Sequence, residues 1–351
     1  MSRYAIQHRT HYRYARPVEL GPHRLMVRPT DSHDLRLEHA TLTLSPLAHV
    51  RWAHDVFGNS IATVTFNAPT DELLIESHLE VTRYSLGDAA IELLPEVSTW
   101  PAIYAPDDRL NLGPFLSCRY GQCSPAVLAW AQEIVKPGAD TLQALRDLNA
   151  AIRIGFTYSQ RFASGVQTPS ETLSRRAGTC RDFATLFIEA ARALGFGARF
   201  VTGYLYDPAL DRGGASGIAG AGATHAWAEV YLPGPGWVEF DPTNGLIESP
   251  SLLRVGVATD AEHAVPVHGS YTGYPEDVID VDIEVKVTAL YARPEPAHPV
   301  DSAATPPVQG ETETEPMQEI AETPSPIATT APIATPAPIA TPAPIARRTA
   351  A

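Results

Sequence analysis

The 351-residue chain has only three cysteines, Cys118, Cys123 and Cys180. So few cysteines exclude the disulfide framework of a small secreted domain and suit a reducing compartment. At most one pair can bridge, and Cys118 and Cys123 are the two that lie close in sequence. No second Cys or His pair stands at ligand spacing to complete a zinc site with them, so we expect no structural metal.

Long apolar runs and basic clusters are also missing. No stretch of about 18 apolar residues occurs, and the first residues lack the apolar core of a signal peptide. Acidic residues outnumber basic ones by 40 to 26, giving a net charge of −14, whereas phosphate backbones require clustered Lys and Arg. The glycine-rich run at 213–222 precedes no helix and is followed by no Lys-Ser/Thr, so it is not a phosphate loop. We therefore expect a cytoplasmic protein with no nucleic-acid partner, no membrane partner and no cofactor.

Proline is abundant but unevenly placed. Of the 32 prolines, 13 fall between Pro294 and the end of the chain, in a segment without Phe, Trp, Tyr or Cys. Such a segment cannot bury enough apolar surface to offset the entropy lost on ordering. We expect residues 294–351 to form a disordered Pro/Ala/Thr-rich tail, dispensable for catalysis. A solvated spacer is the preferred interpretation of its repeats, with docking to an aromatic groove as the alternative and any partner unknown.

The first 90 residues show the pattern of strands. Residues 4–14 alternate between the two faces that a half-buried strand presents. Four further short segments rich in β-branched residues follow, separated by turn clusters: 35–44, 50–54, 60–67 and 73–83. This spacing predicts an antiparallel β-sandwich over residues 1–90.

The periodicity then becomes helical. Ser124-Pro125 and Thr141 each begin an apolar stripe of helical spacing, and Thr168 to Glu171 has capping-box spacing. The segments after Gly178 read as a helix at 180–194 and strands at 198–205, 224–232, 236–241 and 278–290. We predict an α+β chain in which the sandwich leads through a helical connection (91–150) to a catalytic core (151–250) and return strands (251–293). The sequence does not tell which sheet the last strand joins.

Cys180 is the first candidate for chemistry. It falls at the start of the predicted helix, where unpaired backbone N–H groups and the positive end of the helix dipole favour a thiolate. Thr179 and Asp182 have the spacing to cap this end. A cysteine at a helix start is also commonly a small buried apolar residue, so by itself it carries no assignment.

His225 and Asp241 supply the other two groups that an activated thiol needs. His225 lies on a strand whose opposite face is uniformly small or apolar, so we expect the His face to look toward a cleft. Asp241 ends the neighbouring strand and could orient the imidazole. Each residue also has a purely structural interpretation: His225 as a hydrogen-bonded polar side chain, and Asp241 as a turn residue before Pro242. Taken together in chain order, Cys, His and Asp are compatible with a thiol acyl-transfer site.

Four blocks carry a family resemblance: Gly-Thr-Cys-Arg-Asp-Phe-Ala at 178–184, the segment 192–204, Thr-His-Ala-Trp-Ala-Glu-Val at 224–230, and Gly-Trp-Val-Glu-Phe-Asp-Pro-Thr-Asn-Gly at 236–245. Together with the N-terminal Tyr-x-Ile-x-His-x-Thr-x-Tyr-x-Tyr, they resemble the bacterial transglutaminase-like superfamily over roughly residues 1–290. The resemblance implies a papain-like core with Cys180 as nucleophile, His225 as general base and acid, and Asp241 as the residue that orients His225.

From the residues and the resemblance together we predict cysteine-dependent acyl transfer at amide bonds of peptides or proteins through a thioester at Cys180. The acceptor, water or an amine, stays open, so a cysteine protease or amidase and a transamidase are both consistent. The alternative function is a non-catalytic binding module that keeps the transglutaminase-like fold. One oxyanion donor is expected to be the backbone N–H of Cys180 and a second to come from residues 157–160. Residues 213–222 are expected to form a loop that gates access to the site.

Overall fold

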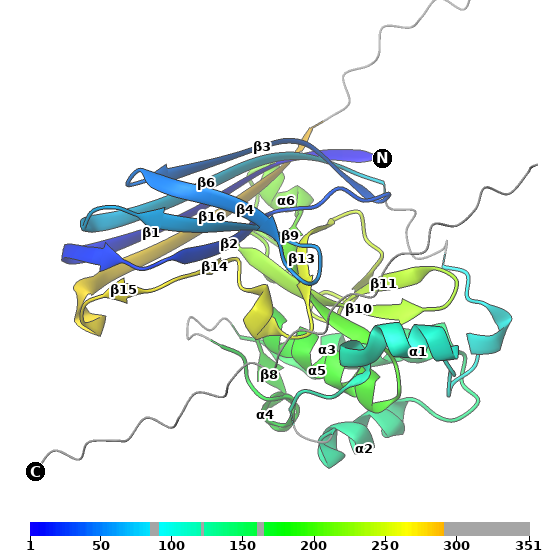
Figure 1. Ribbon diagram of the computed structural model, residues 1–351. Helices are drawn as coiled ribbons and strands as arrows, with labels where there is room; N and C mark the ends of the chain where they lie inside the picture. Colours follow the sequence, from blue (N-terminus) through cyan, green and yellow to red (C-terminus); the bar gives the residue numbers. More distant parts are fainter. Residues whose placement is uncertain (85–90, 121–122, 160–164, 291–351) are drawn as a thin grey trace, which may run out of the picture. The chain divides into compact units, whose positions relative to one another are not determined.

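The computed structural model describes residues 1–84, 91–120, 123–159 and 165–290 (Figure 1). The tail predicted at 294–351 lies outside these residues. Within them, the fold is the expected mixture of helices and mostly antiparallel sheets. The strands and helices segregate, with the long strands of a sandwich on one side and α1 to α5 on the other (Figure 1).

Two antiparallel sheets form the N-terminal sandwich. One has β1 at its centre, paired with β6 along one edge and β16 along the other; the second runs in the order β14-β2-β5-β4. The N-terminal strands are β1 (Ser2–Leu20), β2 (His23–Arg28), β3 (Leu35–Ser45), β4 (Ala48–His54), β5 (Ser60–Phe66) and β6 (Thr70–Arg83). The strands that return from the C-terminal part are β14 (Val267–His268), β15 (Tyr271–Thr272) and β16 (Val278–Leu290).

Buried and more exposed side chains alternate along the first half of the long strand β1. Tyr4, Ile6, His8 and Thr10 are buried on one face, while the residues between them are more exposed. β16 pairs with it antiparallel from Arg3 onward, which answers the question that the sequence left open: the last strand joins the N-terminal sheet. The sandwich is thus completed by residues far beyond position 90. β2 was not anticipated from the sequence.

The second half of the described chain is a five-stranded sheet in the order β12-β11-β10-β9-β13, covered on one face by helices. Its strands are β9 (Ala198–Leu205), β10 (Thr224–Leu232), β11 (Gly236–Asp241), β12 (Leu246–Ile247) and β13 (Leu252–Ala258). The helices are α1 (Pro106–Leu112), α2 (Pro125–Ile134), α3 (Thr141–Gly155), α4 (Pro169–Arg175), α5 (Cys180–Ala193) and α6 (Pro208–Asp211). Among the described residues this half also has two short parallel strands, β7 (Thr157–Tyr158) and β8 (Ala177–Gly178). The 3₁₀ turns of the described chain are η2 (Pro95–Val97), η3 (Gly113–Leu116), η4 (Ala261–Ala264) and η5 (Pro275–Asp277).

α5 is the central helix of this half. Phe183, Leu186, Phe187 and Ala190 are fully or almost fully buried between the sheet and the surrounding helices. Phe187 stacks on Phe240 of β11 with ring centroids 5.3 Å apart. Burial of several such side chains, each contributing about 1.5–3 kcal/mol, fixes the helix against the strands. The start of α5 is therefore held at a defined place beside β10 and β11.

The sandwich packs on the other face of the same sheet. Tyr204 of β9 and Leu253 of β13 share one apolar cluster with Tyr4 and Ile6 of β1. Asn59, in the turn before β5, donates to the carbonyl of Val257 at 2.7 Å and accepts from its N–H at 2.8 Å, as a neighbouring strand would. The sandwich therefore supports the sheet that carries β10 and β11.

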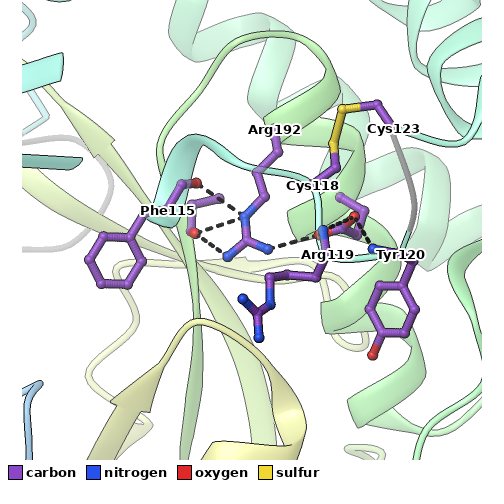
Figure 2. The surroundings of a disulfide bond; sticks show 8 residues. Phe115, Cys118, Arg119, Tyr120, Cys123 and Arg192 are labelled. Carbon is purple, nitrogen blue, oxygen red and sulfur yellow. Dashed lines mark hydrogen bonds and ion pairs between the residues drawn. A yellow bond between two sulfur atoms is a disulfide. The ribbon is translucent and has the colours of Figure 1, made fainter. Parts of the chain in front are cut away.

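Cys118 and Cys123 form a disulfide, as their sequence proximity indicated. The backbone N–H groups of Arg119 and Tyr120, which Figure 2 shows inside the bridged segment, donate to the Glu189 carboxylate on α5. Glu189 in turn pairs with the buried Arg192 one turn later. The bridge thus shapes a segment that binds the C-terminal half of α5.

The cytoplasmic location expected from the sequence stays a prediction. A disulfide is a bond that oxidising compartments favour. Among the described residues no helix is both long and apolar enough to cross a membrane.

Candidate active site

The start of α5 holds Cys180 in place through a capping box. Thr179 is the N-cap, and its side chain accepts from the N–H of Asp182 while the Asp182 carboxylate accepts from the N–H of Thr179 at 2.8 Å. The same carboxylate also accepts from the N–H of Gln167 at 2.7 Å. The capping predicted from the sequence is confirmed. Cys180 is the first residue of the helix and a free thiol, with 7% of its surface exposed.

β10 and β11 bring the other two predicted residues together. Nε2 of His225 lies 2.9 Å from Oδ2 of Asp241, and both side chains are fully buried. Nδ1 of His225 is buried and has no hydrogen-bond partner within the described ranges. The bond through Nε2 therefore leaves Nδ1 as the ring nitrogen available to a thiol.

The charges around His225 favour the imidazolium. Burial by itself lowers the pKa of His225, but the Asp241 carboxylate outweighs burial and Cys180 adds to its effect, so the pKa of His225 rises to about 10. Cys180 therefore lies within electrostatic range of the ring. At neutral pH the histidine carries its proton and can stabilise a neighbouring thiolate.

Asp241 is held as an anion by several donors. Burial raises the pKa of Asp241, yet His225, the Asn244 side chain and the N–H of Thr243 together lower it below its ordinary value. Nδ2 of Asn244 donates to Oδ2 at 2.9 Å, and the N–H of Thr243 donates to Oδ1 at 2.9 Å. Sequence reasoning did not single out Asn244. Its place three residues after Asp241 in the Asp-Pro-Thr-Asn turn is the signal that could have found it.

The strand face that carries His225 is not the open cleft wall expected from the sequence. Trp227 and Glu229, which follow it on that face, are both completely buried. Trp227 packs in a small apolar cluster with Val201 of β9, and Glu229 is paired with arginines. The predicted alternation of side chains along β10 is confirmed, but the face that carries His225 is covered by the sandwich side of the molecule.

A buried charge network lies on this covered face. It joins Asp34 and Arg83 of the sandwich to side chains of β9, β10, β11 and β13. Its members are three arginines and four carboxylates: Arg83, Arg199, Arg254, Asp34, Glu229, Glu239 and Glu248. Burial raises the pKa of Glu239 to about 8 despite Arg83, with Glu248 and Glu229 adding to the rise. One excess carboxylate in a buried network is most simply balanced by one bound proton.

Tyr158 of β7 is the side chain from the predicted oxyanion segment that the structure places near the site. β7 pairs with β8, so Tyr158 lies opposite Gly178, two residues before Cys180. Burial and the nearby Cys180 raise the pKa of Tyr158 to about 12. Its hydroxyl therefore remains a proton donor at neutral pH. Gln160 lies outside the described residues.

Within the described ranges, no three His, Cys, Asp or Glu side chains gather in a way that could hold a metal ion. Trp237, in the sequence block at 236–245, is half-buried, with the Arg199 guanidinium 4.0 Å above its ring.

Two family models match the chain: the bacterial transglutaminase-like N-terminal region at residues 4–82 and the transglutaminase-like superfamily at residues 128–242. An uncharacterized protein of Mycobacterium tuberculosis is 32% identical over 303 residues, covering 81% of this chain and 92% of that protein. Human peptide-N(4)-(N-acetyl-beta-glucosaminyl)asparagine amidase is 28% identical over 142 residues, covering 38% of this chain and 19% of the amidase.

A solved structure shares the fold. It is the crystal structure of a candidate cysteine protease from Cytophaga hutchinsonii, with a TM-score of 0.61 and 19% identity, covering 87% of this chain and 93% of that one. The chain described here belongs to the transglutaminase-like superfamily, with the bacterial N-terminal region preceding the core.

Proposed function

We propose that the protein is a cysteine-dependent enzyme that transfers acyl groups at amide bonds of peptides or proteins, with Cys180, His225 and Asp241 as its triad. The observation that carries the proposal is the buried His225–Asp241 pair beside the start of α5, with Nδ1 of His225 left for the thiol. Membership of the transglutaminase-like superfamily supports a thiol mechanism in general.

The reaction would proceed in two halves. The Cys180 thiolate attacks the amide carbonyl carbon, forming a C–S bond and an oxyanion, and the C–N bond breaks as the His225 imidazolium gives its proton to the leaving nitrogen. The neutral imidazole then takes a proton from water or from a primary amine, which attacks the thioester carbonyl. The C–S bond breaks, the thiolate returns and His225 is again protonated.

The oxyanion would be stabilised at the helix start. The N–H of Cys180 belongs to the first turn of α5, whose N–H groups have no acceptor within the helix, and the dipole of α5 favours negative charge there. The Tyr158 hydroxyl is the second candidate donor, because it stays protonated and lies in range of Cys180.

The test compares Cys180→Ala and His225→Ala with wild type on a peptide library, with and without a labelled primary amine. His263→Ala, at a histidine exposed on the surface, is the matched control. We expect each site variant to lower kcat/KM by about 10³-fold or more and the control to leave it unchanged. Release of acid would identify a hydrolase, and incorporation of the amine a transamidase. If Cys180→Ala and His225→Ala both turn over substrate as fast as wild type, the proposal is wrong and a non-catalytic binding module becomes the better account of the protein.

A further inference from the structure

The segment between α6 and β10, residues 212–223, reaches the catalytic histidine from the side opposite Asp241. We call this segment the cover loop. An ideal Cβ built on Gly220 would lie 2.6 Å from Nδ1 of His225, closer than real Cβ atoms approach. The backbone at Gly220 therefore lies directly against the ring nitrogen that the thiol must reach, and only a glycine fits there.

The Asn244 side chain joins the cover loop to the candidate triad. Oδ1 of Asn244 accepts from the N–H of Ala219 at 3.0 Å, and Nδ2 donates to the carbonyl of Ala219 at 3.1 Å. The second hydrogen on Nδ2 goes to Oδ2 of Asp241, the oxygen that also binds His225. One amide thus joins the triad carboxylate to the loop that covers the triad histidine.

The rest of the cover loop lies largely at the surface. Residues 212–217 are exposed, while Ser216 is anchored to Asp207 at one end and the Gly222 carbonyl accepts from Val285 of β16 at the other. Such an exposed segment with fixed ends opens at low cost. Cys180, His225 and Asp241 have little or no exposed surface in this arrangement, so an acyl substrate needs the loop to lift.

We infer that Asn244 is a positioning residue that holds Asp241 against His225 and, through Ala219, latches the cover loop closed over the site until substrate displaces it. This inference rests on the proposed function for its substrate, an acyl group on its way to Cys180. Breaking the two bonds to Ala219 removes two of the three hydrogen bonds that orient the Asn244 amide, so opening the loop also loosens its hold on Asp241. Access and alignment of the triad are thereby coupled.

Two glycines of the cover loop allow a matched test. Gly220 has φ +84° and Gly213 has φ +77°, so alanine meets the same backbone penalty at both, but the space around Gly213 is empty to 4 Å. Only Gly220→Ala adds a methyl group against His225. Cys180 is the free thiol of the chain, so iodoacetamide labelling followed by intact mass reports access to it.

We expect Gly220→Ala to speed labelling of Cys180 about tenfold relative to Gly213→Ala, because the loop can no longer close. Asn244→Ala should accelerate hydrogen exchange at the Ala219 amide about tenfold, the shift expected for two lost hydrogen bonds. Equal labelling of the two glycine variants, or unchanged Ala219 exchange in Asn244→Ala, would overturn the latch.

The positioning role has its own readout, the titration of His225 followed by NMR. The titratable groups facing its ring are Asp241, Cys180 and, through Cys180, Tyr158. Asn244→Ala should lower the His225 midpoint because Asp241 is no longer held against the ring, whereas Gly213→Ala should leave it in place; an unmoved midpoint in Asn244→Ala would contradict this role. If Ala219 exchange responds while no variant turns over amides, the latch stands and the proposed function fails. If wild type turns over amides and the variants match it in labelling, hydrogen exchange and His225 titration, the proposed function stands and the latch fails.

Discussion

At the scale of residues, one hydrogen bond decides the chemistry open to this site. Asp241 uses Oδ2 to hold Nε2 of His225, which fixes both the orientation of the ring and the nitrogen left for Cys180. Without that carboxylate, burial would lower the pKa of His225 with Cys180 left to oppose it, so the imidazolium would lose its main support. The thiol would then lose the positive partner that stabilises its anion.

Asp241→Asn tests this account, because it keeps the shape of the side chain and removes its charge. We expect kcat/KM to fall by about 10⁴-fold, as tautomer and charge are both wrong. Wild-type activity should persist into alkaline solution and decline only as His225 loses its proton near pH 10, while the alkaline limb of the variant should lie at lower pH. Profiles of kcat/KM against pH measure the loss of activity and the position of the alkaline limb. Asp147→Asn, at an exposed aspartate, is the control. A variant whose alkaline limb coincides with that of wild type would show that Asp241 does not set the charge of His225.

At the scale of elements, α5 is held at both ends. The capping box fixes its first turn under Cys180, and Glu189 near its other end receives two N–H groups from the disulfide-bridged segment (Figure 2). Buried Arg192 extends this anchor to the carbonyls of Phe115, Ala198 and Thr259. The bridge therefore supports the helix that begins at Cys180, although it lies away from the candidate triad residues in sequence.

Replacing both bridge cysteines, Cys118→Ser together with Cys123→Ser, should lower the free energy of unfolding by about 2 kcal/mol, the value for closing so short a loop. Urea denaturation measures it. Dithiothreitol should lower the urea concentration at which wild type is half unfolded to that of the double variant. It should leave the midpoint of the double variant unchanged. An unchanged wild-type midpoint in the reductant would mean that the bridge does not contribute to stability.

At the scale of the whole described molecule, the sandwich and the five-stranded sheet are joined through buried charge as well as apolar packing. Arg83 at the end of β6 binds both Asp34 and Glu239, and Arg254 of β13 binds Asp34 and Glu229. Glu239 lies two residues before Asp241 on the same strand. The hydrogen bond from Arg83 to Glu239 therefore helps to position β11, and the raised pKa of Glu239 makes that support depend on pH.

The sign of this dependence follows from linkage. Folded Glu239 keeps its proton to about pH 8, whereas the unfolded side chain releases it near its ordinary pKa of about 4.3. Stability from this group is therefore full at low pH and is lost as pH rises between those values. Glu239→Gln should unfold at nearly the same urea concentration as wild type at pH 4 and be about 5 kcal/mol more stable at pH 9, the free energy that corresponds to the interval between the two pKa values. Glu133→Gln, at an exposed glutamate, is the control, and equal stability of Glu239→Gln and wild type at both pH values would contradict the assignment.

Local signals were sufficient for much of this molecule. The alternation at 4–14, the capping residues Thr168 and Thr179, and the glycine after Leu194 placed strands and helices within a few residues of their observed ends. These features act between near neighbours in the chain, so they can be read without the fold. The four sequence blocks likewise indicated the superfamily.

Contacts between distant residues decided the rest. Sequence alone did not show that β16 pairs with β1, that the face carrying His225 is buried under the sandwich, or that Asn244 reaches Ala219. Each depends on which surfaces meet when segments separated by up to hundreds of residues pack together, and a residue pattern specifies a face without naming its partner. The sequence thus determined the elements and the candidate triad, while the tertiary structure decided what covers the triad and what holds it aligned.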